Sequence, residues 1–360
     1  MTKIITKPDD ILKYLPKEKC LTVRIDEAKE AIRNGHQFAI TEFYLSKIIK
    51  GDPEHILLNA VLPSIDDLEV LRGMHTSVEE VKISASEYMI QKYQPNSIVT
   101  LTTKCAQYCT YCFRKQHDPK SASVEEISKI VNDIENAGEG YMEVIFSGGD
   151  PLMVNPILLE YLAEKISAVR EKKKLLIGLN TRVPIVNPKL CHGQKLKALE
   201  KIKPGNVGLH ILHPDEITEE FKEACYALRE NTYLNFRTTH PLLKGINDDS
   251  KILTDMYQQL AEEINAVPKD LIVPIPTGAG KAKRLSLERC MEIMRDLHYN
   301  LPGNLLPRLI VCSPVYGKSY LDPFHTKKDG SFGYDISQEG TYLNMHIKDG
   351  SCLQKCKAIK

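Results

Sequence analysis

The sequence predicts an α/β protein whose core is a partial (β/α)6 TIM-like barrel, with an N-terminal helical region before it and a C-terminal extension after it. Two observations predict this fold. Between residues 98 and 300, apolar β-branched segments alternate about six times with amphipathic segments, which is typical of parallel strands joined by right-handed crossovers. Polar residues and glycines recur just after the strand-like segments, at the rim where such barrels carry their chemistry.

The composition is that of an ordinary soluble globular protein, with 42% hydrophobic and 26% charged residues among 360 and a formal net charge of +1. The near-neutral charge gives no sign of a nucleic-acid partner. No apolar run reaches the roughly 18 residues of a membrane-spanning helix. The N-terminal segment lacks the apolar core of a secretory signal, so we expect a cytoplasmic protein whose ten cysteines do not form a disulfide framework.

Residues 1–95 form the predicted N-terminal helical region. From residue 8 to about 90 the chain is charged and reads as helical, with interruptions at Pro53 and Pro63. The segment SVEEVKISASEYMIQKY, residues 77–93, starts with the Ser-x-x-Glu pattern of a capping box, and we therefore expect a helix there.

The predicted core, residues 96–318, opens with the β-branched strand SIVTLTT. The helix SVEEISKIVNDIENAG follows, with apolar residues at helical spacing and Gly138 as its stop. One more strand and a Pro/Gly-rich turn come after residue 301, and residues 319–360 form the C-terminal extension. The other strands are expected at 142–151, 175–186, 206–212, 233–243 and 269–276, and the other helices at 158–174, 195–202, 216–232 and 249–264.

The segment TTKCAQYCTYCFRKQ, residues 102–116, places Cys105, Cys109 and Cys112 at spacings of four and three on one loop. Three thiolates so arranged can hold three corners of a cubane iron–sulfur cluster. The fourth iron then lacks a protein ligand and can take a small molecule. The alternatives are a zinc ion with a distant fourth cysteine, or three unrelated thiols.

With the aromatic Tyr111 directly before its last cysteine, the triplet resembles the signature of the radical SAM superfamily. The resemblance implies a barrel of the radical SAM type and a [4Fe-4S] cluster on Cys105, Cys109 and Cys112. It also implies that the free iron binds S-adenosyl-L-methionine and splits it to a 5′-deoxyadenosyl radical. The turn FSGGDP, one strand later, offers glycines for close approach and an acid for the ammonium. We therefore expect cofactor contacts at Tyr111, Ser147, Gly148, Gly149 and Asp150.

Longer segments, found in the same order, narrow this resemblance to the lysine 2,3-aminomutase family, from about residue 5 to about 320. They are AITEFYLSKIIKGDPEHILLNAVLPS, CTYCFRKQ, VIFSGGDPLMV, LNTRVPIVNP, HILHPDEITEE, LLKGIND and a terminal GK turn. The resemblance implies an isomerase that moves an amino group from C2 to C3 of a small amino acid. It further implies pyridoxal 5′-phosphate as second cofactor, a reductant such as flavodoxin or ferredoxin, and a homo-oligomer.

Three basic residues match positions with roles in that family. Lys318 in SPVYGKSY matches the lysine that holds pyridoxal phosphate as an internal aldimine, which requires a transiently neutral amine. Arg182 in NTRVPIV matches an arginine near the cofactor phosphate. Arg114 matches the arginine that holds the substrate carboxylate. For Lys318 the alternative is an ordinary solvated charge, and for Arg182 it is a pair with a surface carboxylate.

The chain departs from the family pattern around the cofactor phosphate. IQKYQPNSIV has Lys92 and Asn96 where arginines are expected, and KQHD replaces the arginine run after Arg114. An alternative is therefore a radical SAM enzyme of the same family without pyridoxal phosphate. Such an enzyme would abstract hydrogen for epimerisation, dehydrogenation or protein modification. A non-catalytic protein that keeps the cluster is a third interpretation.

The chain also differs from the family pattern at the two positions where acids would recognise the distal ammonium of a lysine substrate. Cys312 stands in place of one, and the loop VPIPTGAGKAKR has no acid, but has Lys281, Lys283 and Arg284. Because an unpaired ammonium is costly to bury, we expect a substrate other than free L-lysine.

Two further features have open interpretations. Cys352 and Cys356 form a possible zinc site, although Asp249 stands where a partner's cysteine is expected. His210 and His213 follow a strand and can be cofactor contacts or structural histidines.

Overall fold

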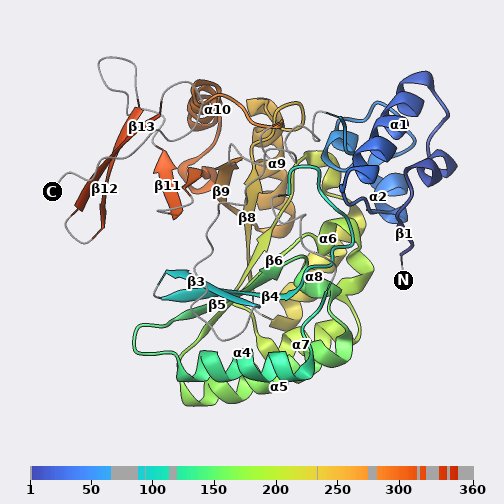
Figure 1. The fold of residues 1–360 in the computed structure, drawn as a ribbon. Helices are drawn as coiled ribbons and strands as arrows, with labels where there is room; N and C mark the ends of the chain where they lie inside the picture. Colours follow the sequence, from blue (N-terminus) through green and yellow to red (C-terminus); the bar gives the residue numbers. More distant parts are fainter. Residues whose placement is uncertain are drawn as a thin grey trace.

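The computed structural model describes residues 2–65, 88–93, 95–112, 120–232, 234–274, 282–313, 317–321, 332–338 and 341–347. Its core is a nine-stranded sheet in the order β11-β10-β9-β8-β7-β6-β5-β4-β3 (Figure 1). Strands β4 to β10 are parallel, and β3 and β11 are antiparallel to their neighbours. The strands are β3 (Met89–Tyr93), β4 (Asn96–Thr102), β5 (Glu143–Gly148), β6 (Leu176–Thr181), β7 (Asn206–Leu209), β8 (Asn235–Pro241), β9 (Val267–Val273), β10 (Arg308–Ser313) and β11 (Gly317–Leu321).

Helices follow the parallel strands in six consecutive strand–helix units of the described chain, which confirms the partial (β/α)6 prediction. Each buries an apolar stripe on the sheet. For example, α4 starts with a capping box between Ser123 and Glu126 and buries Ile127, Ile130 and Ile134. The helices are α4 (Val124–Asn136), α5 (Pro156–Lys172), α6 (Val183–Val186), α7 (Gln194–Ile202), α8 (Glu219–Thr232), α9 (Ser250–Ile264) and α10 (Leu287–Asn300).

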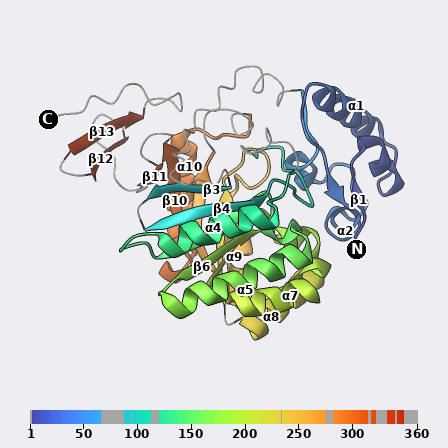
Figure 2. The ribbon, with the colours of Figure 1, turned by 60° about the horizontal axis from the view of Figure 1, so that its bottom comes forward.

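The two faces of the sheet differ in chemistry. Figures 1 and 2 show α4, α5 and α7 together on one side of the strands, and the side chains on that side, such as Val144 and Phe146, are buried. On the opposite face, which we call the inner face, a Cβ on Gly178 would meet the side chains of Glu143 and Ile145. The inner face therefore carries polar and charged groups together with apolar ones.

The sheet curls around this inner face. Three strands separate β5 from β9, so a flat sheet would hold them roughly 19 Å apart at about 4.8 Å per strand. Nevertheless, the carboxylate of Glu143 on β5 contributes to the pKa of Lys269 on β9. This interaction indicates that β5 and β9 lie closer together than in a flat sheet, as they do in an open barrel.

A β-bulge interrupts β9. Thr238 pairs with Pro268, but the next residue of β8, Thr239, pairs with Asp270, which leaves Lys269 as the extra residue. Bulges re-aim side chains and are frequent beside functional sites. This one allows two consecutive charged residues, Lys269 and Asp270, to interact with groups on the inner face.

The N-terminal region is only partly helical. It contains α1 (Lys19–Arg33), α2 (Glu42–Tyr44), two 3-10 turns (Pro8–Lys13 and Ile56–Ala60), a π-helical turn (Leu45–Ile49) and the short antiparallel pair β1 (Ile4–Ile5) and β2 (Ile40–Thr41).

The helix predicted over 77–93 is wrong at its C-terminal end. Residues 89–93 form β3, an antiparallel edge of the core sheet, because pairing with β4 overrides the local helical signal. The start of that predicted helix lies outside the described residues.

The C-terminal extension includes the hairpin of β12 (Phe332–Gln338) and β13 (Thr341–Ile347). Cys352 and Cys356 lie outside the described residues. The division points proposed at residues 95 and 318 fall within the β3–β4 hairpin and within β11, so the core sheet itself extends from Met89 to Leu321.

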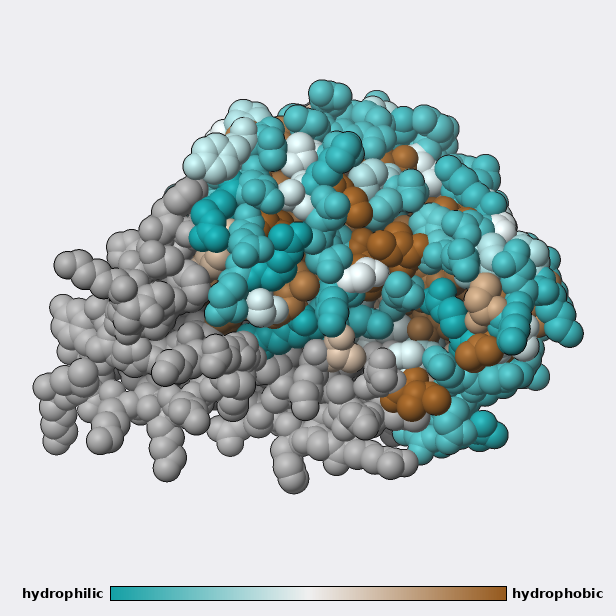
Figure 3. Space-filling model, turned by 90° about the horizontal axis from the view of Figure 1, so that it is seen from above, coloured by the Kyte–Doolittle hydropathy of each residue, from teal (hydrophilic) through white to brown (hydrophobic). Residues whose placement is uncertain are grey.

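The surface seen from above is mostly hydrophilic, with hydrophobic side chains in small separate groups over the described part of the chain (Figure 3). Among the described residues, no helix has both the length and the apolar character to cross a membrane.

Candidate functional site

The three clustered cysteines lie on the loop that leaves the carboxyl end of β4. None of the three cysteines is in a disulfide, and all three are half-buried. The N-terminal region holds the backbone of this loop from behind: Tyr108 N donates to Ala39 O at 3.0 Å and Thr110 N to Ala60 O at 2.8 Å. The loop is thus fixed at the rim where the parallel strands end.

The chemistry of these thiols suits an iron–sulfur cluster. The pKa of the Cys105 thiol is raised well above its usual value, first by burial and then by Asp150, Cys112 and Cys109. Three thiolates that repel one another in a partly buried loop are stabilised by a cationic centre. Within the described ranges, no three His, Cys, Asp or Glu side chains already converge on one point. The loop offers the right ligands, which would turn toward a shared cluster.

The glycine turn after β5 packs directly against the start of the cysteine loop. Gly148 has φ +111°, and a Cβ there would overlap the side chain of Thr100. A Cβ on Gly149 would overlap the carbonyl oxygen of Lys104, the residue before Cys105. Gly149 N donates to Thr102 O at 2.8 Å. Both glycines are therefore required where the exits of β4 and β5 meet.

Asp150 joins the exits of β5 and β6. Its carboxylate accepts hydrogen bonds from Leu152 N at 3.0 Å, Arg182 N at 2.8 Å and Val183 N at 3.2 Å. The Thr181 hydroxyl lies 2.8 and 2.9 Å from its two oxygens. Burial raises its pKa and these bonds oppose that shift. Asp150 thus positions two strand ends, and its contact with a bound ammonium stays a prediction.

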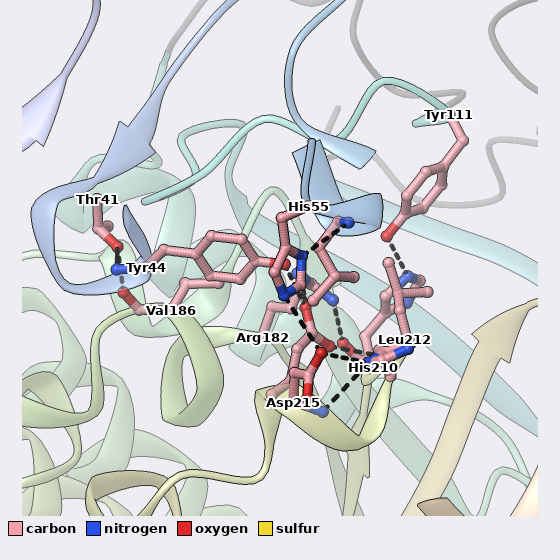
Figure 4. A network of polar contacts seen from close by, with 12 residues as sticks. Thr41, Tyr44, His55, Tyr111, Arg182, Val186, His210, Leu212 and Asp215 are labelled. Carbon is pink, nitrogen blue, oxygen red and sulfur yellow. Dashed lines mark hydrogen bonds and ion pairs between the residues drawn. The ribbon is translucent and has the colours of Figure 1, made fainter. Parts of the chain in front are cut away.

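Arg182 belongs to a buried ionic network shown in Figure 4. Its Nη2 donates to Glu216 Oε1 at 2.5 Å and its Nη1 to His210 O at 2.6 Å. The Tyr44 hydroxyl from the N-terminal region donates to the same Glu216 oxygen at 2.6 Å. Arg182 Nε, in contrast, is buried without a hydrogen-bond partner among the described residues. The expected phosphate contact would therefore use Nε or replace an internal bond.

Tyr111, directly before the last cysteine, stacks on His210. The two ring centroids lie 5.7 Å apart with 6° between the planes, and Tyr111 Oη is 3.0 Å from His210 Nε2 (Figure 4). Burial, followed by Cys109, raises the pKa of Tyr111, whereas burial, followed by Arg182, lowers the pKa of His210. A protonated tyrosine and a neutral histidine follow, and the tautomer of the His210 ring decides which of the two atoms donates.

Lys318 lies on β11. Its Nζ donates to Asp270 Oδ2 at 3.1 Å, and Arg308 Nη2 donates to Asp270 Oδ1 at 2.9 Å. Asp270 is 1% exposed, whereas the side chains of Lys318 and Arg308 are 41% and 50% exposed. Arg114 and the side chain of Cys312 lie outside the described residues.

The structure therefore brings the predicted residues together in two places. Asp150, Arg182 and Tyr111 share one connected site, because Arg182 contacts both Asp150 and His210 and Tyr111 contacts His210. Cys105 adjoins it, since Asp150 N donates to the preceding residue at Lys104 O. Lys318 lies on the antiparallel edge strand, next to Asp270.

Sequence reasoning missed Glu216, Tyr44 and Asp270. Their partners lie far away in the chain: Tyr44 and Glu216, for example, are 172 positions apart. No local pattern could have indicated these pairs.

Comparison with known proteins places this geometry in a family. Residues 99–256 match the model of the radical SAM superfamily. A putative L-lysine 2,3-aminomutase of Aquifex aeolicus is 30% identical over 88% of this chain and 84% of its own. The L-lysine 2,3-aminomutase of Clostridium subterminale is 26% identical, over 86% and 73% respectively. The glutamate 2,3-aminomutase of Clostridioides difficile is 27% identical, over 87% and 73%.

Among solved structures, the chain is similar to anSMEcpe with bound AdoMet and a Cp18Cys peptide, with a TM-score of 0.45 and 18% identity over 57% of this chain and 59% of that one. This similarity is too distant to inform the site. The extent of the match to the Aquifex aeolicus protein, together with the superfamily match over the parallel core, is decisive. This chain belongs to the lysine 2,3-aminomutase-like family of the radical SAM superfamily and is an isomerase, a radical SAM aminomutase.

Proposed function

We propose that the protein moves an amino group from C2 to C3 of an amino acid other than free L-lysine, using a [4Fe-4S] cluster, S-adenosyl-L-methionine and pyridoxal 5′-phosphate. The observation that carries this proposal is the loop of three clustered cysteines, none of them in a disulfide, at the carboxyl end of the parallel sheet, with a glycine turn packed against it. Relatives named as lysine and glutamate 2,3-aminomutases support the reaction class.

Each part of the site has a distinct role in this proposal. Cys105, Cys109 and Cys112 hold the cluster, and the turn Ser147–Asp150 binds S-adenosyl-L-methionine beside it. Lys318 supplies the amine that holds pyridoxal phosphate, with Arg182 near its phosphate and Arg114 at the substrate carboxylate. When bound, the cluster and its ligand supply a hydrogen-abstracting radical, and pyridoxal phosphate supplies a conjugated ring that spreads an unpaired electron.

The protein itself contributes positioning and exclusion of water. Tyr111, stacked on His210, is 8% exposed, and Asp150 and Arg182 behind it are also buried. The N-terminal region covers the back of the cysteine loop through Tyr108 and Thr110. A site closed on these sides protects reactive intermediates from side reactions.

Charges on the inner face support a substrate other than lysine. Asp270 is a buried acid there, but Lys318 and Arg308 already hold its two oxygens. Arg237 on β8 is exposed and pairs with Gly208, whose added Cβ would meet the inner-face side chain of Asn180. A neutral or acidic side chain suits these surroundings better than a second ammonium.

The cluster is tested by anaerobic reconstitution. We expect bound iron and sulfide in the wild type, and 5′-deoxyadenosine after addition of S-adenosyl-L-methionine and a reductant such as flavodoxin, ferredoxin or dithionite. Cys109→Ala should lose both. Cys20→Ala removes another half-buried free thiol and should keep both. Retention of the cluster and its cleavage activity in Cys109→Ala contradicts the ligand assignment.

The second cofactor and the substrate are tested separately. Wild type incubated with pyridoxal phosphate should gain a visible absorption band that borohydride abolishes, and Lys318→Ala should not. Incubation of the loaded enzyme with single amino acids, followed by detection of β-amino products, identifies the substrate. Turnover of free L-lysine ahead of the others would show that the substrate proposal is wrong.

A second candidate is a radical SAM enzyme of this family that works without pyridoxal phosphate. One observation favours it: two of the three guanidinium nitrogens of Arg182 are already bound to Glu216 and His210. A wild type that cleaves S-adenosyl-L-methionine but shows no cofactor band would support this candidate and reject the first.

A further inference from the structure

We propose that Asp270 is the positioning residue of Lys318: its carboxylate holds the lysine ammonium on the inner face whenever the amine is not covalently engaged. Arg308 fixes the carboxylate in turn. This inference deepens the proposed function, on which the covalent role of Lys318 rests.

The first support is the burial of Asp270. A carboxylate that is 1% exposed is stable only with charged or hydrogen-bonding partners. Asp270 has one cation on each oxygen, Arg308 on Oδ1 at 2.9 Å and Lys318 on Oδ2 at 3.1 Å. Both cations have partly exposed side chains, so they reach inward to this acid from a more open surface.

The second support is the bulge in β9. In a regular strand Lys269 and Asp270 would point to opposite faces. The extra residue at the bulge lets both interact with groups on the inner face. The pKa of Lys269 is lowered, first by its burial, while Asp270 and Glu143 oppose that shift and Lys318 and Arg308 add to it. The bulge therefore brings Lys269 and Asp270 together on the face that carries Lys318.

The third support is a chain of side-chain contacts that links Asp270 back to β11. The guanidinium of Arg308 lies 4.5 Å from the ring centroid of Tyr320, and Tyr320 is two residues beyond Lys318 on the same face of that strand. Tyr320 holds Arg308, Arg308 holds Asp270, and Asp270 holds Lys318. Because the chain of contacts begins and ends on β11, the position of the lysine amine is fixed relative to its own strand.

This arrangement keeps the lysine in its unreactive form until the amine is engaged. An ammonium has no lone pair and must first lose a proton. The ion pair with Asp270 stabilises the ammonium, so the proton passes to solvent only when Nζ leaves the carboxylate. When the amine is released again, uptake of a proton from solvent restores the ion pair.

The test uses the full chain without bound metal or cofactor and labels its amines with trinitrobenzenesulfonate. Labelling at Lys318 is quantified by peptide mass spectrometry between about pH 7 and 10, where lysine amines become neutral. Asp270→Asn should label Lys318 about threefold to fivefold faster near pH 8, as expected for loss of one ion pair, and its pH profile should move to lower pH. Within the described part of the chain, the charged groups that share the inner face with Lys318 in this cluster are Glu143, Lys269, Asp270 and Arg308.

Arg308→Gln should not increase the labelling rate at Lys318, in contrast to Asp270→Asn. This difference distinguishes loss of the ion pair from general unfolding, which would speed labelling in both variants. The variant loses the contact that orients the carboxylate, but it also leaves Lys318 as the one cation on the buried Asp270 among the described residues. We expect this charge effect to dominate, so labelling should be slower than in the wild type or equal to it. As a matched control, Glu263→Gln removes a partner of Lys222, which also contacts Glu219. That variant should speed labelling at Lys222 and leave Lys318 unchanged.

Two results overturn the inference: an unchanged Lys318 profile in Asp270→Asn, or the same acceleration in Arg308→Gln as in Asp270→Asn. The cofactor band distinguishes this failure from that of the proposed function. If the labelling pattern is as expected but wild type forms no borohydride-sensitive band, the cofactor proposal fails and the ion pair stands. If the band forms while labelling ignores Asp270, only this inference fails.

Discussion

Three buried carboxylates each join elements that are separate in the sequence. Asp150 joins the exits of β5 and β6, Glu216 joins the N-terminal region to Arg182, and Asp270 joins β9 to β10 and β11. A buried charge without partners is strongly destabilising, so each carboxylate tolerates one arrangement of its neighbours. These three acids therefore fix the relative positions of the elements around the site.

At the residue scale, we predict that acid destabilises the protein partly through His240. Burial lowers its pKa from 6.5 to about 4, and its neutral ring lies 2.9 Å from the Tyr257 hydroxyl. Because the folded-state pKa is lowered, the unfolded chain binds the proton more readily between these two values. The stability is fully present above pH 6.5 and is lost as pH falls toward 4, by about 3 kcal/mol.

Urea unfolding of wild type and His240→Gln at pH 7 and pH 4.5 measures this contribution. The loss of unfolding free energy between the two pH values should be smaller in the variant, because glutamine does not titrate. Equal losses in the two proteins would contradict the assignment.

Single residues differ in how far the sequence could reveal them. The cysteine triplet and its aromatic neighbour were predicted as a ligand set from their spacing alone, and their ligand role stays a prediction. His210 was a candidate without a partner, and the structure supplies Tyr111. Asp270 follows a lysine in an ordinary strand. Its importance comes from a bulge and from a lysine 48 positions away in the chain, and no local pattern contains such a contact.

At the scale of elements, the exits of β4 and β5 form a unit. Their contact puts Gly149 against the backbone of Thr103 and Lys104 and connects the end of one strand to the start of the cysteine loop. The position of the first thiol therefore depends on a residue that carries no side chain.

We predict that Gly149→Ala destabilises the fold by about 1–3 kcal/mol, the usual cost of overpacking, and lowers iron incorporation. The added Cβ would overlap backbone atoms, which cannot rotate away as a flexible side chain can. Gly138→Ala is the matched control, because nothing lies within 4 Å of its added Cβ in the described part of the structure. Denaturant unfolding and iron content measure both effects, and equal behaviour of the two variants would refute the packing argument.

Most strands and helices of the core follow from the sequence, because the alternation of apolar patterns has both the right period and the right length. The exception is β3, where a helical pattern was expected over residues 77–93 and the chain pairs with β4 instead. Edge pairing depends on a neighbour that becomes available only once the sheet has formed, so local periodicity does not report it.

At the scale of the whole molecule, the N-terminal region is part of the site. It binds the cysteine loop at Tyr108 and Thr110 and the barrel at Glu216, through Tyr44. Thr41 adds a hydrogen bond of 2.6 Å to Val186 O, at the end of α6. The sequence predicted this region as a separate helical segment, because its contacts with the barrel involve residues more than a hundred positions away.

We predict a graded loss of stability when this docking is weakened. Glu216→Ala leaves the buried Arg182 charge without its carboxylate and should cost about 3–5 kcal/mol. Tyr44→Phe removes one hydrogen bond and should cost about 1 kcal/mol. Glu160→Ala, which removes an exposed carboxylate paired with Lys201, should stay within about 0.5 kcal/mol.

Denaturant unfolding measures these costs, and limited proteolysis should cut the N-terminal region first in Glu216→Ala. A Glu216→Ala protein as stable as the Glu160→Ala control would contradict the docking role.

The antiparallel strand β11 has two structural roles. It carries Lys318, and it pairs with the edge of β10, whose backbone N–H and C=O groups could otherwise pair with another chain. Loss of this strand would remove the proposed cofactor lysine and would expose the backbone edge of β10 to pairing with other chains. Inactivity and aggregation should therefore appear together in truncations that remove β11, and substitutions confined to the lysine side chain should separate them.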